Sequence, residues 1–441
     1  MLLEFKATNY KSFKEEFVFS MIPAPKLKGL DYSVLKTKVG KKQYNALCSA
    51  VVYGPNASGK SNIIGAMDVF RSIVLRGNVR NSADIKNEPN HAAVFLELIP
   101  NNTLDQSAPV QFSITFIEKG FHIEYALSVK IGKFMQEVKK RKILSETLKI
   151  NDSLIFSRGN GLDFGSLEVI KEFLISEFGQ NEAAVKLISE RNLDGEELFL
   201  INGFKAMFSS SLVSLITGWL ENKFRTIYRA DTMRLMPDVR SFEGSSKLFI
   251  DFISEVMRCF GVTSSEIGYV ANKDDNDARL VSFVKWGNRE KALPAAMFES
   301  HGTIRFINLI PLIAEILLSG GTLVVDEFDA SIHPMALMSI INIFHNDEIN
   351  IYRAQLIFNT HNPIFLNKNL FRRDEIKFVE RDDESHNSSL YALSDFGTAG
   401  KRGVRNNDDY MKNYFIDRYG AIKDIDFAPH FEELMNNNNE V

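Results

Sequence analysis

The sequence is poor in cysteine. Only two cysteines, Cys48 and Cys259, occur in 441 residues, and they lie far apart. A disulfide framework needs several cysteines in a short chain, and a cysteine metal cluster needs closely spaced pairs. The two positions therefore fit neither a disulfide scaffold nor a metal cluster.

The sequence also lacks a long, uninterrupted apolar run and an N-terminal targeting segment. Its longest apolar stretch, Ile307–Leu318, contains Asn308, Pro311 and Glu315, which predicts that the stretch is too short and too polar to span a bilayer. The opening residues, Leu2–Lys6, alternate like an amphipathic strand rather than a signal sequence. We expect a cytoplasmic protein without a membrane partner.

An excess of basic charge is missing as well. The 52 Lys and Arg residues are outnumbered by 56 Asp and Glu residues, and the net charge of −4 gives no global field that recruits nucleic acid. Binding to DNA would need a local patch, for which Lys139–Lys142 and the pair Arg402 and Arg405 are candidates. Short basic runs are more often solvated faces, so nucleic-acid binding is not established by the sequence.

A phosphate-binding pattern is present near the N-terminus. Residues 54–61 read GPNASGKS, between an apolar strand-like segment at 50–53 and a helical segment at 62–70. We expect backbone N–H groups to surround the phosphates of ATP, Lys60 to reach the β- and γ-phosphates, and the Ser61 hydroxyl to bind Mg²⁺. The candidate nucleotide-binding residues of this segment are Gly54, Pro55, Asn56, Ala57, Ser58, Gly59, Lys60, Ser61 and Asn62.

Two acids end a second apolar strand. Asp326 and Glu327 follow the segment 322–325, and a carboxylate at the end of a buried strand is costly unless it is paired or binds a metal. We expect Asp326 to hold Mg²⁺ through water and Glu327 to activate the attacking water as general base. The alternative is a strand that ends at a solvated acidic turn.

Two further segments offer groups to an anion. His361 follows the apolar strand 354–358, where an imidazole can contact the γ-phosphate; a structural histidine at a strand end is the alternative. Ser300 and Gly302 precede an apolar helical run at 304–318, where a hydroxyl and free N–H groups can bind an anion. A simple helix N-cap is the alternative for this segment.

The order of these segments carries a resemblance. GPNASGKSN, ESHGT, VVDEFDASIHP and NTHNP resemble the Walker A, signature, Walker B/D-loop and switch-histidine motifs of ABC-type ATPases. Within that class the chain resembles the prokaryotic AAA15 ATPases, relatives of the RecF, Rad50 and OLD ATPases. Members include the ATPase subunits of phage-defence systems such as PARIS, and RloA/AbiL-type ATPases encoded beside a nuclease-like partner.

The resemblance implies that two heads meet around ATP and Mg²⁺. Ser300 and Gly302 of one subunit would then complete the ATP site of the other, and Asp329 would lie at the interface between the heads. The chain departs from the broader pattern at Ala57, where many relatives have glycine, and at His301, where the transporter signature has glycine. A glutamine loop has two candidates, Gln106 and Gln111.

The predicted fold class is α/β. The resemblance implies an ABC-type head, with a mixed β lobe and a RecA-like lobe around a parallel sheet, built from residues 1–160 and 290–425. Between them, 161–289 is predicted to be a mostly helical insertion with a short strand-rich return. Helical periodicity in this range predicts helices near 167–174, at 204–220 and at 245–260. In the first part of the head, β-rich patterning predicts a strand at 94–99 and a hairpin at 110–130 that turns at 118–120. Residues 426–441 are expected to form a frayed tail.

Two classes of function compete. One is a slow ATPase that assembles through its heads and controls a separate effector, a nuclease or toxin, in anti-phage defence. The other is a RecF-like clamp on DNA, and a transporter subunit is less favoured because no membrane partner is implied. The acidic run Glu380–Glu384 lies in a predicted turn without a partner cluster, which argues against a built-in nuclease.

Overall fold

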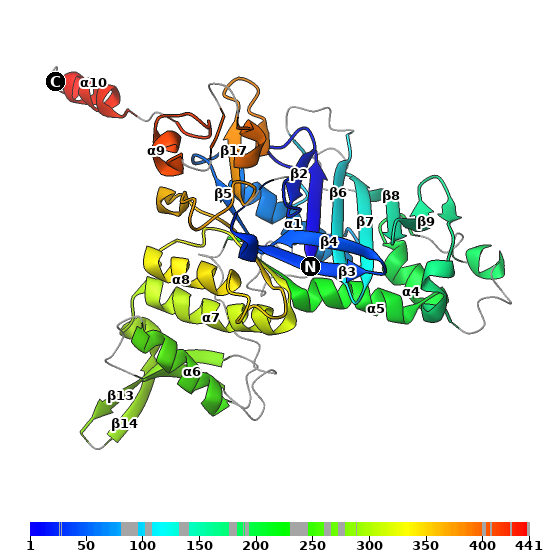
Figure 1. Cartoon of the computed structure of the whole chain (residues 1–441), viewed down its shortest axis with the longest axis horizontal. Coiled ribbons are helices and arrows are strands. Elements are labelled where there is room, and N and C mark those ends of the chain that lie inside the picture. Colours follow the sequence, from blue (N-terminus) through cyan, green and yellow to red (C-terminus); the bar gives the residue numbers. More distant parts are fainter. Residues whose placement is uncertain are drawn as a thin grey trace.

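Two β-sheets form the body of the molecule in the computed structural model (Figure 1). One is antiparallel and seven-stranded, and the other is six-stranded and largely parallel. The structure describes residues 1–25, 27, 29–80, 96–101, 108–131, 141–175, 183–187, 189, 194–229, 246–259, 266–271, 278–287, 289–398, 403–405, 408–423 and 426–438.

The largely parallel sheet has the strand order β11-β15-β16-β5-β17-β18, and only the β17–β18 pair is antiparallel. Strands β5, β15 and β16 are buried along their whole length, which agrees with the continuous apolar runs of the sequence. Because these strands point the same way, the segments that follow them meet at one edge of the sheet. Its strands are β11 (Phe224–Ile227), β15 (Thr322–Val325), β16 (Gln355–Asn359), β5 (Ser49–Tyr53), β17 (Ile376–Arg381) and β18 (Ser388–Ala392).

Helices cover both faces of this sheet. Ala50 and Val52 of β5 belong to the core that includes α1 (Lys60–Arg76), whereas Val51 and Tyr53 belong to the core that includes α7 (His301–Ser319) and α8 (Pro334–Phe344). Side chains alternate between the faces of a strand, so β5 contributes to two hydrophobic cores. The phosphate-loop segment therefore leaves a strand that is fixed from both sides.

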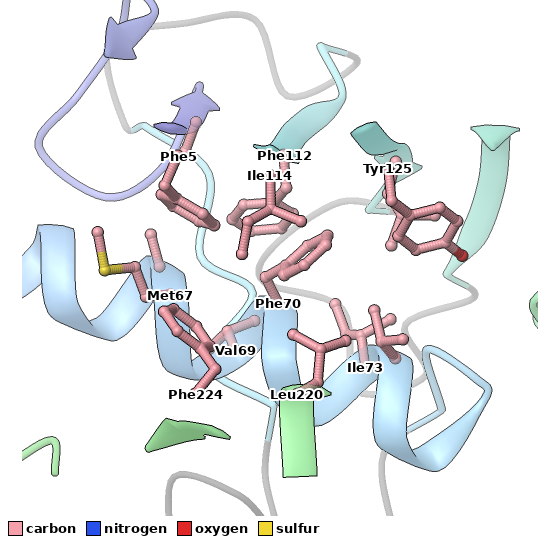
Figure 2. Close-up of a cluster of buried hydrophobic side chains, with 14 of the residues drawn as sticks. Phe5, Met67, Val69, Phe70, Ile73, Phe112, Ile114, Tyr125, Leu220 and Phe224 are labelled. Carbon is pink, nitrogen blue, oxygen red and sulfur yellow. The ribbon is translucent and has the colours of Figure 1, made fainter. Parts of the chain in front are cut away.

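The antiparallel sheet packs against α1 from the other direction. Figure 2 shows Phe5 of β1, Phe112 of β6 and Tyr125 of β7 around Phe70 of α1, with Phe70 ring centroids 5.8 Å from Phe5 and 6.1 Å from Phe112. The predicted hairpin is confirmed, with Gly120 at φ +80° in its turn. The strands, in sheet order, are β10 (Leu162–Phe164), β9 (Ser153–Arg158), β8 (Lys142–Ile150), β7 (Phe121–Lys130), β6 (Val110–Glu118), β1 (Leu2–Thr8) and β2 (Phe17–Ser20).

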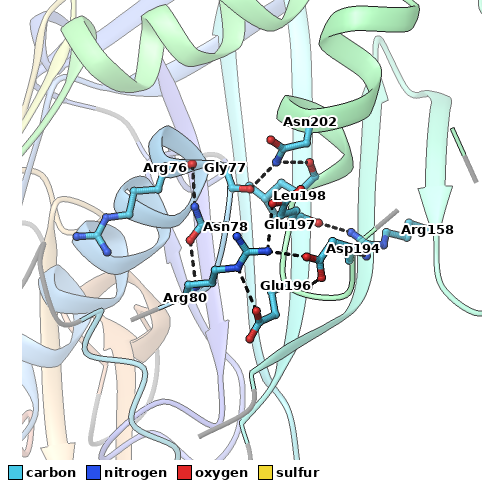
Figure 3. A network of polar contacts seen from close by, with 10 residues as sticks. All are labelled: Arg76, Gly77, Asn78, Arg80, Arg158, Asp194, Glu196, Glu197, Leu198 and Asn202. Atoms are coloured by element: carbon cyan, nitrogen blue, oxygen red, sulfur yellow. Dashed lines mark hydrogen bonds and ion pairs between the residues drawn. The ribbon is translucent and has the colours of Figure 1, made fainter. Parts of the chain in front are cut away.

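A polar network fixes the C-terminal end of α1 (Figure 3). The Gly77 carbonyl accepts hydrogen bonds from the Leu198 amide at 2.9 Å and from Asn202 Nδ2 at 2.8 Å. Just beyond, Arg80 pairs with Asp194 at 2.5 Å and with Glu196 at 3.0 Å. Helix α1 is thus held at the end opposite to the phosphate-loop segment.

The region predicted as a helical insertion starts with strand β10 of the antiparallel sheet, and irregular helices follow. The predicted helix 204–220 is interrupted at Phe208, and Ser209 caps the next helix by accepting a hydrogen bond from the Leu212 amide. The predicted helix near 167–174 is a short 3₁₀ segment. The elements here are η2 (Glu168–Phe173), η3 (Leu200–Phe204), α4 (Lys205–Met207), α5 (Ser210–Gly218) and η4 (Trp219–Lys223).

Strand β11 was not predicted, and it ties this region to the parallel sheet. It pairs with β15 from Phe224 to Ile227, so the range 161–289 contributes a strand to the sheet that the sequence assigned to the head alone. The later part of the range forms the predicted helix and strands, namely α6 (Ser246–Cys259), β12 (Glu266–Ala271) and β13 (Ala278–Trp286), and the paired strand β14 (Arg289–Pro294) extends past the predicted boundary at 289. Helix α6 packs against β12 and α7.

The C-terminal residues depart from the expected frayed tail. Ala428–Asn438 form helix α10, which projects from the body in Figure 1. The expected strand at 94–99 is also wrong over its described part, because residues 96–99 form a turn and extended backbone without strand pairing. The remaining elements are η1 (Asp31–Ser33), β3 (Val34–Val39), β4 (Lys42–Leu47), η6 (Ala295–Met297), η7 (Pro363–Phe365), η8 (Leu393–Phe396) and α9 (Tyr410–Phe415).

Helix α7 is longer than the apolar stretch read from the sequence. The helix has 19 residues and a mean hydropathy of 1.5. By length and composition alone, such a helix can cross a membrane, so the expectation that the apolar stretch is too short is wrong by this measure. The apolar side chains of α7 belong to the core against β15, as those of a core helix do. The buried members are Phe306, Ile307, Leu309, Ile310, Ile313 and Ile316.

One predicted basic patch is structural. Arg141 is 5% exposed and donates hydrogen bonds to the carbonyls of Val79 at 3.2 Å and Leu96 at 3.1 Å. Burial lowers its pKa to about 10. Its neighbours Lys139 and Lys140, and also Arg402, lie outside the described residues. Arg141 is therefore not part of a surface for DNA.

Candidate active site

The segment between β5 and α1 turns sharply around its glycines. Gly59 adopts φ +110° and leads directly into the helix, and a Cβ atom there would approach Ser12 Oγ to 2.6 Å. A Cβ atom on Gly54 would overlap the Val379 carbonyl. Ala57 occupies the left-handed region at φ +62°, a conformation that glycine adopts without strain. Asn56 and Ala57 are exposed, whereas Ser58 is buried.

Lys60 is the first residue of α1, and its ammonium group turns back over the loop. It is 5% exposed, and Nζ donates to the carbonyls of Gly54 at 2.7 Å and Pro55 at 2.9 Å. Burial lowers the pKa of Lys60 to about 8, against the opposing effect of Asp326, Glu327 and Asp329. A buried cation held by carbonyls alone is suited to an incoming anion.

Ser61 and Asp326 meet although they are 265 residues apart in the chain. Ser61 Oγ donates to Asp326 Oδ1 at 2.8 Å, and Asp326 is 3% exposed. The same oxygen accepts a hydrogen bond from Asn359 Nδ2 at 2.6 Å, and Asp326 Oδ2 accepts one from the Arg229 amide at 3.3 Å. A hydroxyl beside a carboxylate supplies the oxygen ligands that Mg²⁺ prefers. The two residues predicted to bind the metal are therefore brought together.

Glu327 lies in a strained, well-supported position. Its φ of +50° is in the left-handed region, which non-glycine residues adopt at a cost of about 1–2 kcal/mol. Its amide donates to Asn359 Oδ1, and its carbonyl accepts a hydrogen bond from Arg305. Backbone strain of this kind is common at functional sites, where neighbouring groups hold an acid in a chosen direction.

Sequence reasoning missed Asn359 and Arg305. The side-chain amide of Asn359 contacts both acids at once, and Arg305 of α7 donates to the carbonyls of Asp326, at 3.3 Å, and Glu327. A polar residue at the end of the buried strand β16 was the available signal for Asn359. No signal in the sequence marks Arg305.

His361 lies just beyond β16, where the charges of nearby residues affect its pKa. It is an exposed residue whose pKa is lowered by desolvation and then by the positive charge of Lys60, while Asp329 and Asp326 act in the opposite sense. The imidazole is therefore favoured in its neutral form near pH 7. A neutral ring can still donate one N–H to a phosphate oxygen.

Ser300 and Gly302 begin helix α7. Ser300 is exposed and caps the helix, with its Oγ accepting from the Thr303 amide at 3.1 Å. A side chain at Gly302 would overlap the carbonyl of Ser331, in the segment that follows Asp329. The helix start therefore packs on the Asp326–Ser331 segment of the same chain, and the Ser300 hydroxyl remains at the surface.

The N-terminal loop after β1 also contacts the phosphate loop. Ser12 Oγ accepts from Asn62 Nδ2 at 2.8 Å, and the Ser12 carbonyl accepts from the Ser388 amide at 2.7 Å. Ser388 Oγ donates to the Ser58 carbonyl at 2.5 Å. Neither serine was singled out from the sequence, because the contacts join segments that are far apart in the chain.

A charged cluster adjoins this loop. Glu97 accepts from Lys11 Nζ at 2.5 Å, pairs with Arg229 at 2.9 Å and accepts from the Tyr228 hydroxyl at 3.1 Å. Desolvation is the largest single effect and raises the pKa of Glu97, but these contacts together outweigh it, so the pKa is lowered. Since the Arg229 amide donates to Asp326, the cluster supports the carboxylate that the sequence predicts to bind Mg²⁺.

The two glutamine-loop candidates have different outcomes. Gln111 is exposed in β6, opposite Thr8, and no contact joins it to the phosphate loop among the described residues. Gln106 lies outside the part of the chain that the structure describes. Neither is placed at the site.

Comparison with known proteins decides the family. A family profile described as "AAA domain, putative AbiEii toxin, Type IV TA system" matches residues 49–367. The chain belongs to this AAA-domain family. The matched range encloses the phosphate loop, Ser300, the two acids and His361.

Among solved structures, one similar chain comes from "Crystal structure of the SmcHead bound to the C-winged helix domain of ScpA". It shares 14% sequence identity, the match covers 89% of this chain and 97% of that chain, and the TM-score is 0.39. No curated protein matches the sequence.

The residues present fit a Mg²⁺–triphosphate group. Lys60 offers a buried ammonium, Ser61 and Asp326 offer adjacent oxygen ligands, and the first amides of α1 lie in the loop that Gly59 bends. Each is a group that phosphate or Mg²⁺ attracts.

Proposed function

We propose that this AAA-family domain binds Mg²⁺–ATP at the loop 54–61 and hydrolyses it, with Glu327 as general base. The observation that carries the proposal is the 2.8 Å contact between Ser61 and Asp326, because it joins the two metal-binding residues beside a buried lysine. Bound Mg²⁺ would neutralise phosphate charge and orient the γ-phosphate.

Each side chain then has a role that follows from its position. Lys60 releases the loop carbonyls and binds phosphate oxygens, and Asn359 holds Asp326 and the backbone of Glu327 in register. Glu327 orients and deprotonates water. His361, whose neutral form is favoured, donates an N–H to the γ-phosphate.

Nucleotide binding tests this assignment directly. Lys60→Ala is expected to weaken Mg²⁺–ATP binding more than about tenfold, which corresponds to about 1.4 kcal/mol. Glu327→Gln is expected to retain ATP in the presence of Mg²⁺, measured by equilibrium binding of a fluorescent analogue. Lys42→Ala serves as a control because Lys42 is exposed on β4. If Lys60→Ala binds Mg²⁺–ATP with wild-type affinity, the nucleotide does not bind at this loop.

We also propose that two heads associate around ATP. Ser300 is exposed at the start of α7, and Gly302 packs on the Ser331 carbonyl of the same chain, so the Ser300 hydroxyl lies at the surface beside the segment that contains Asp329. Ser300 and Gly302 would bind the γ-phosphate of the partner subunit's nucleotide, and Asp329 would lie at the same interface. The resemblance in motif order supports this arrangement.

For the biological role we propose a regulatory ATPase that controls a separate nuclease or toxin in anti-phage defence, as in PARIS or RloA/AbiL-type systems. The family description, which names a toxin and a toxin–antitoxin system, supports this class. The acids of the run Glu380–Glu384 do not converge: Asp382 accepts the Ser385 amide at 2.7 Å, and Asp383 pairs with Lys423. A RecF-like clamp is the alternative, and Arg141, one residue of its candidate basic patches, is buried and does not contribute to a DNA surface. A cytoplasmic location stays a prediction.

Affinity purification separates the two roles. Glu327→Gln would be purified from cells that carry the native flanking genes, with ATP and nuclease present. A stoichiometric protein that survives nuclease treatment is the expected result. Recovery of DNA alone, lost at high salt, would overturn the effector role in favour of the clamp.

A further inference from the structure

Three chemically different side chains converge at the other end of β5, away from the phosphate loop. Their ligand atoms, Cys48 Sγ, His345 Nε2 and a Glu375 carboxylate oxygen, all lie within 4.8 Å of one another. Cys48 and Glu375 are 0% exposed and His345 is 6% exposed. Sequence spacing gave no sign of this cluster, because its members lie in three distant parts of the chain.

Well-ordered elements hold the three residues. Cys48 immediately precedes β5, Glu375 immediately precedes β17, and His345 caps the C-terminus of α8. Strands β5 and β17 are parallel neighbours, and the Val51 amide donates to the Glu375 carbonyl at 2.9 Å. The backbone therefore fixes the cluster, which does not depend on a flexible loop.

Among the described residues, no Lys or Arg side chain forms an ion pair with the buried carboxylate of Glu375. Glu375 Oε1 lies 3.3 Å from His345 Nε2 and accepts from Ser49 Oγ at 2.7 Å, while Oε2 accepts from the Arg372 amide at 2.7 Å. The guanidinium of Arg372 is paired with Asp374 at 2.9 Å instead. An ionised carboxylate in such surroundings requires a compensating positive charge.

The separation between the nitrogen and the oxygen matches that of a tetrahedral zinc site, and the sulfur lies somewhat farther away. With bonds of about 2.0 Å to nitrogen and oxygen and about 2.3 Å to sulfur, the ligand atoms of such a site stand about 3.3 Å apart for N and O and about 3.5 Å for S and O. The corresponding separations here are 3.3 Å between His345 Nε2 and Glu375 Oε1, and 4.0 Å between Cys48 Sγ and Glu375 Oε1. A small side-chain movement would bring Cys48 Sγ to the expected distance from Glu375 Oε1.

We propose that Cys48, His345 and Glu375 bind a structural zinc ion. Ser49 Oγ, which is 0% exposed, lies 2.9 Å from His345 Nε2 and 2.7 Å from Glu375 Oε1, so it supports two of the ligands by hydrogen bonds. Thiolate and imidazole together favour zinc over the hard cations Mg²⁺ and Ca²⁺. All three ligands are buried, which separates the ion from any substrate and assigns it a structural role.

Metal binding would join the start of β5 to β17 and to α8. In the metal-free protein hydrogen bonds join Ser49 to His345 and to Glu375. Zinc displaces protons from the ligands that it binds, so its affinity is expected to rise with pH. This site is independent of the proposed ATPase activity.

Cobalt substitution of the full chain tests the proposal, because thiolate bound to Co²⁺ gives a charge-transfer band. We expect one Co²⁺ per chain with that band, displaced by Zn²⁺, and a rise in the thermal unfolding temperature. Cys259→Ser is the matched control, since it removes the exposed cysteine and is expected to change nothing. Cys48→Ser is expected to abolish the band and weaken the affinity at least about tenfold.

X-ray absorption of the zinc-loaded Cys259→Ser variant keeps the test valid if Cys48→Ser fails to fold. One sulfur in the first coordination shell must then come from Cys48, since no other cysteine remains. A shell of nitrogen and oxygen alone, or a chain that binds no Co²⁺ or Zn²⁺, would overturn the proposal. In that case protons and hydrogen bonds alone satisfy the cluster.

Discussion

Asn359 positions both acids of the site through one side-chain amide. Its Nδ2 donates to Asp326 Oδ1 at 2.6 Å, and its Oδ1 accepts from the Glu327 amide. The sequence drew attention to His361 two residues later, because histidine carries recognisable chemistry and an asparagine at a strand end does not. The contact of Asn359 with the acids depends on the parallel pairing of β15 and β16, which no local pattern reveals.

We predict that Asn359→Leu lowers kcat about 10–100-fold with a smaller change in ATP affinity. Leucine has a similar side-chain volume but cannot form either hydrogen bond. Glu327 and Asp326 are therefore no longer held in their relative positions, while the contacts of Lys60 are unchanged. Steady-state phosphate release and equilibrium ATP binding give the two numbers. Asn45→Ala, an exposed position on β4, is the control. Equal turnover in Asn359→Leu and the wild type would refute this role for Asn359.

The pKa of Lys60 predicts a pH dependence of ATP binding. Because burial lowers the pKa to about 8 in the free protein, Lys60 is charged below that pH and loses its proton above it. Only the charged form attracts phosphate, so the Kd for ATP is expected to be flat at pH 6–7 and to rise up to about tenfold per pH unit beyond pH 8. Lys60→Arg should remove this rise, as titration of Kd against pH would show.

At the scale of elements, strands were predicted better than helices. The apolar runs at 50–53, 322–325 and 354–358 became fully buried strands, and the hairpin at 110–129 was confirmed. The helix expected at 204–220 is interrupted, because Phe208 leaves the helical conformation and Ser209 starts a new helix. Apolar side chains continue through the break, so periodicity alone did not reveal it.

The cap of helix α5 gives a test at this scale. Ser209 is fully buried, accepts from the Leu212 amide at 3.1 Å and donates to the Phe173 carbonyl at 2.7 Å. Ser209→Ala is expected to lower the free energy of unfolding by about 1–2 kcal/mol. Ser211→Ala, at an exposed position of the same helix, should change it by less than about 0.5 kcal/mol. Denaturant unfolding of both variants measures the difference.

At the scale of the whole molecule, the sequence predicted the motif residues but not the contacts between distant segments. Ser61 and Asp326 were each identified, and the structure brings them together. Ser12 and Arg305 were missed, since each acts through a neighbour that only the folded chain supplies. The strand β11 was missed because a four-residue edge strand has no distinctive period.

Association of the heads is a prediction at this scale. With ATP and Mg²⁺, Glu327→Gln is expected to shift from monomer to dimer in light scattering. Adding Ser300→Arg should prevent the shift while ATP binding stays intact, because a bulky cation would occupy the exposed helix start. Ser300→Thr keeps the cap and the hydroxyl and should dimerise. A dimer that forms unchanged with Ser300→Arg would place the interface elsewhere.

The most direct test of the central claim is the rate of phosphate release from ATP by Glu327→Gln, beside the wild type and Glu384→Gln. Glu384 is an exposed acid outside the site and serves as the matched control. If Glu327 is the general base, its variant should lose at least about 100-fold in kcat, while the control retains full turnover. Wild-type turnover by Glu327→Gln would contradict the proposed hydrolytic site.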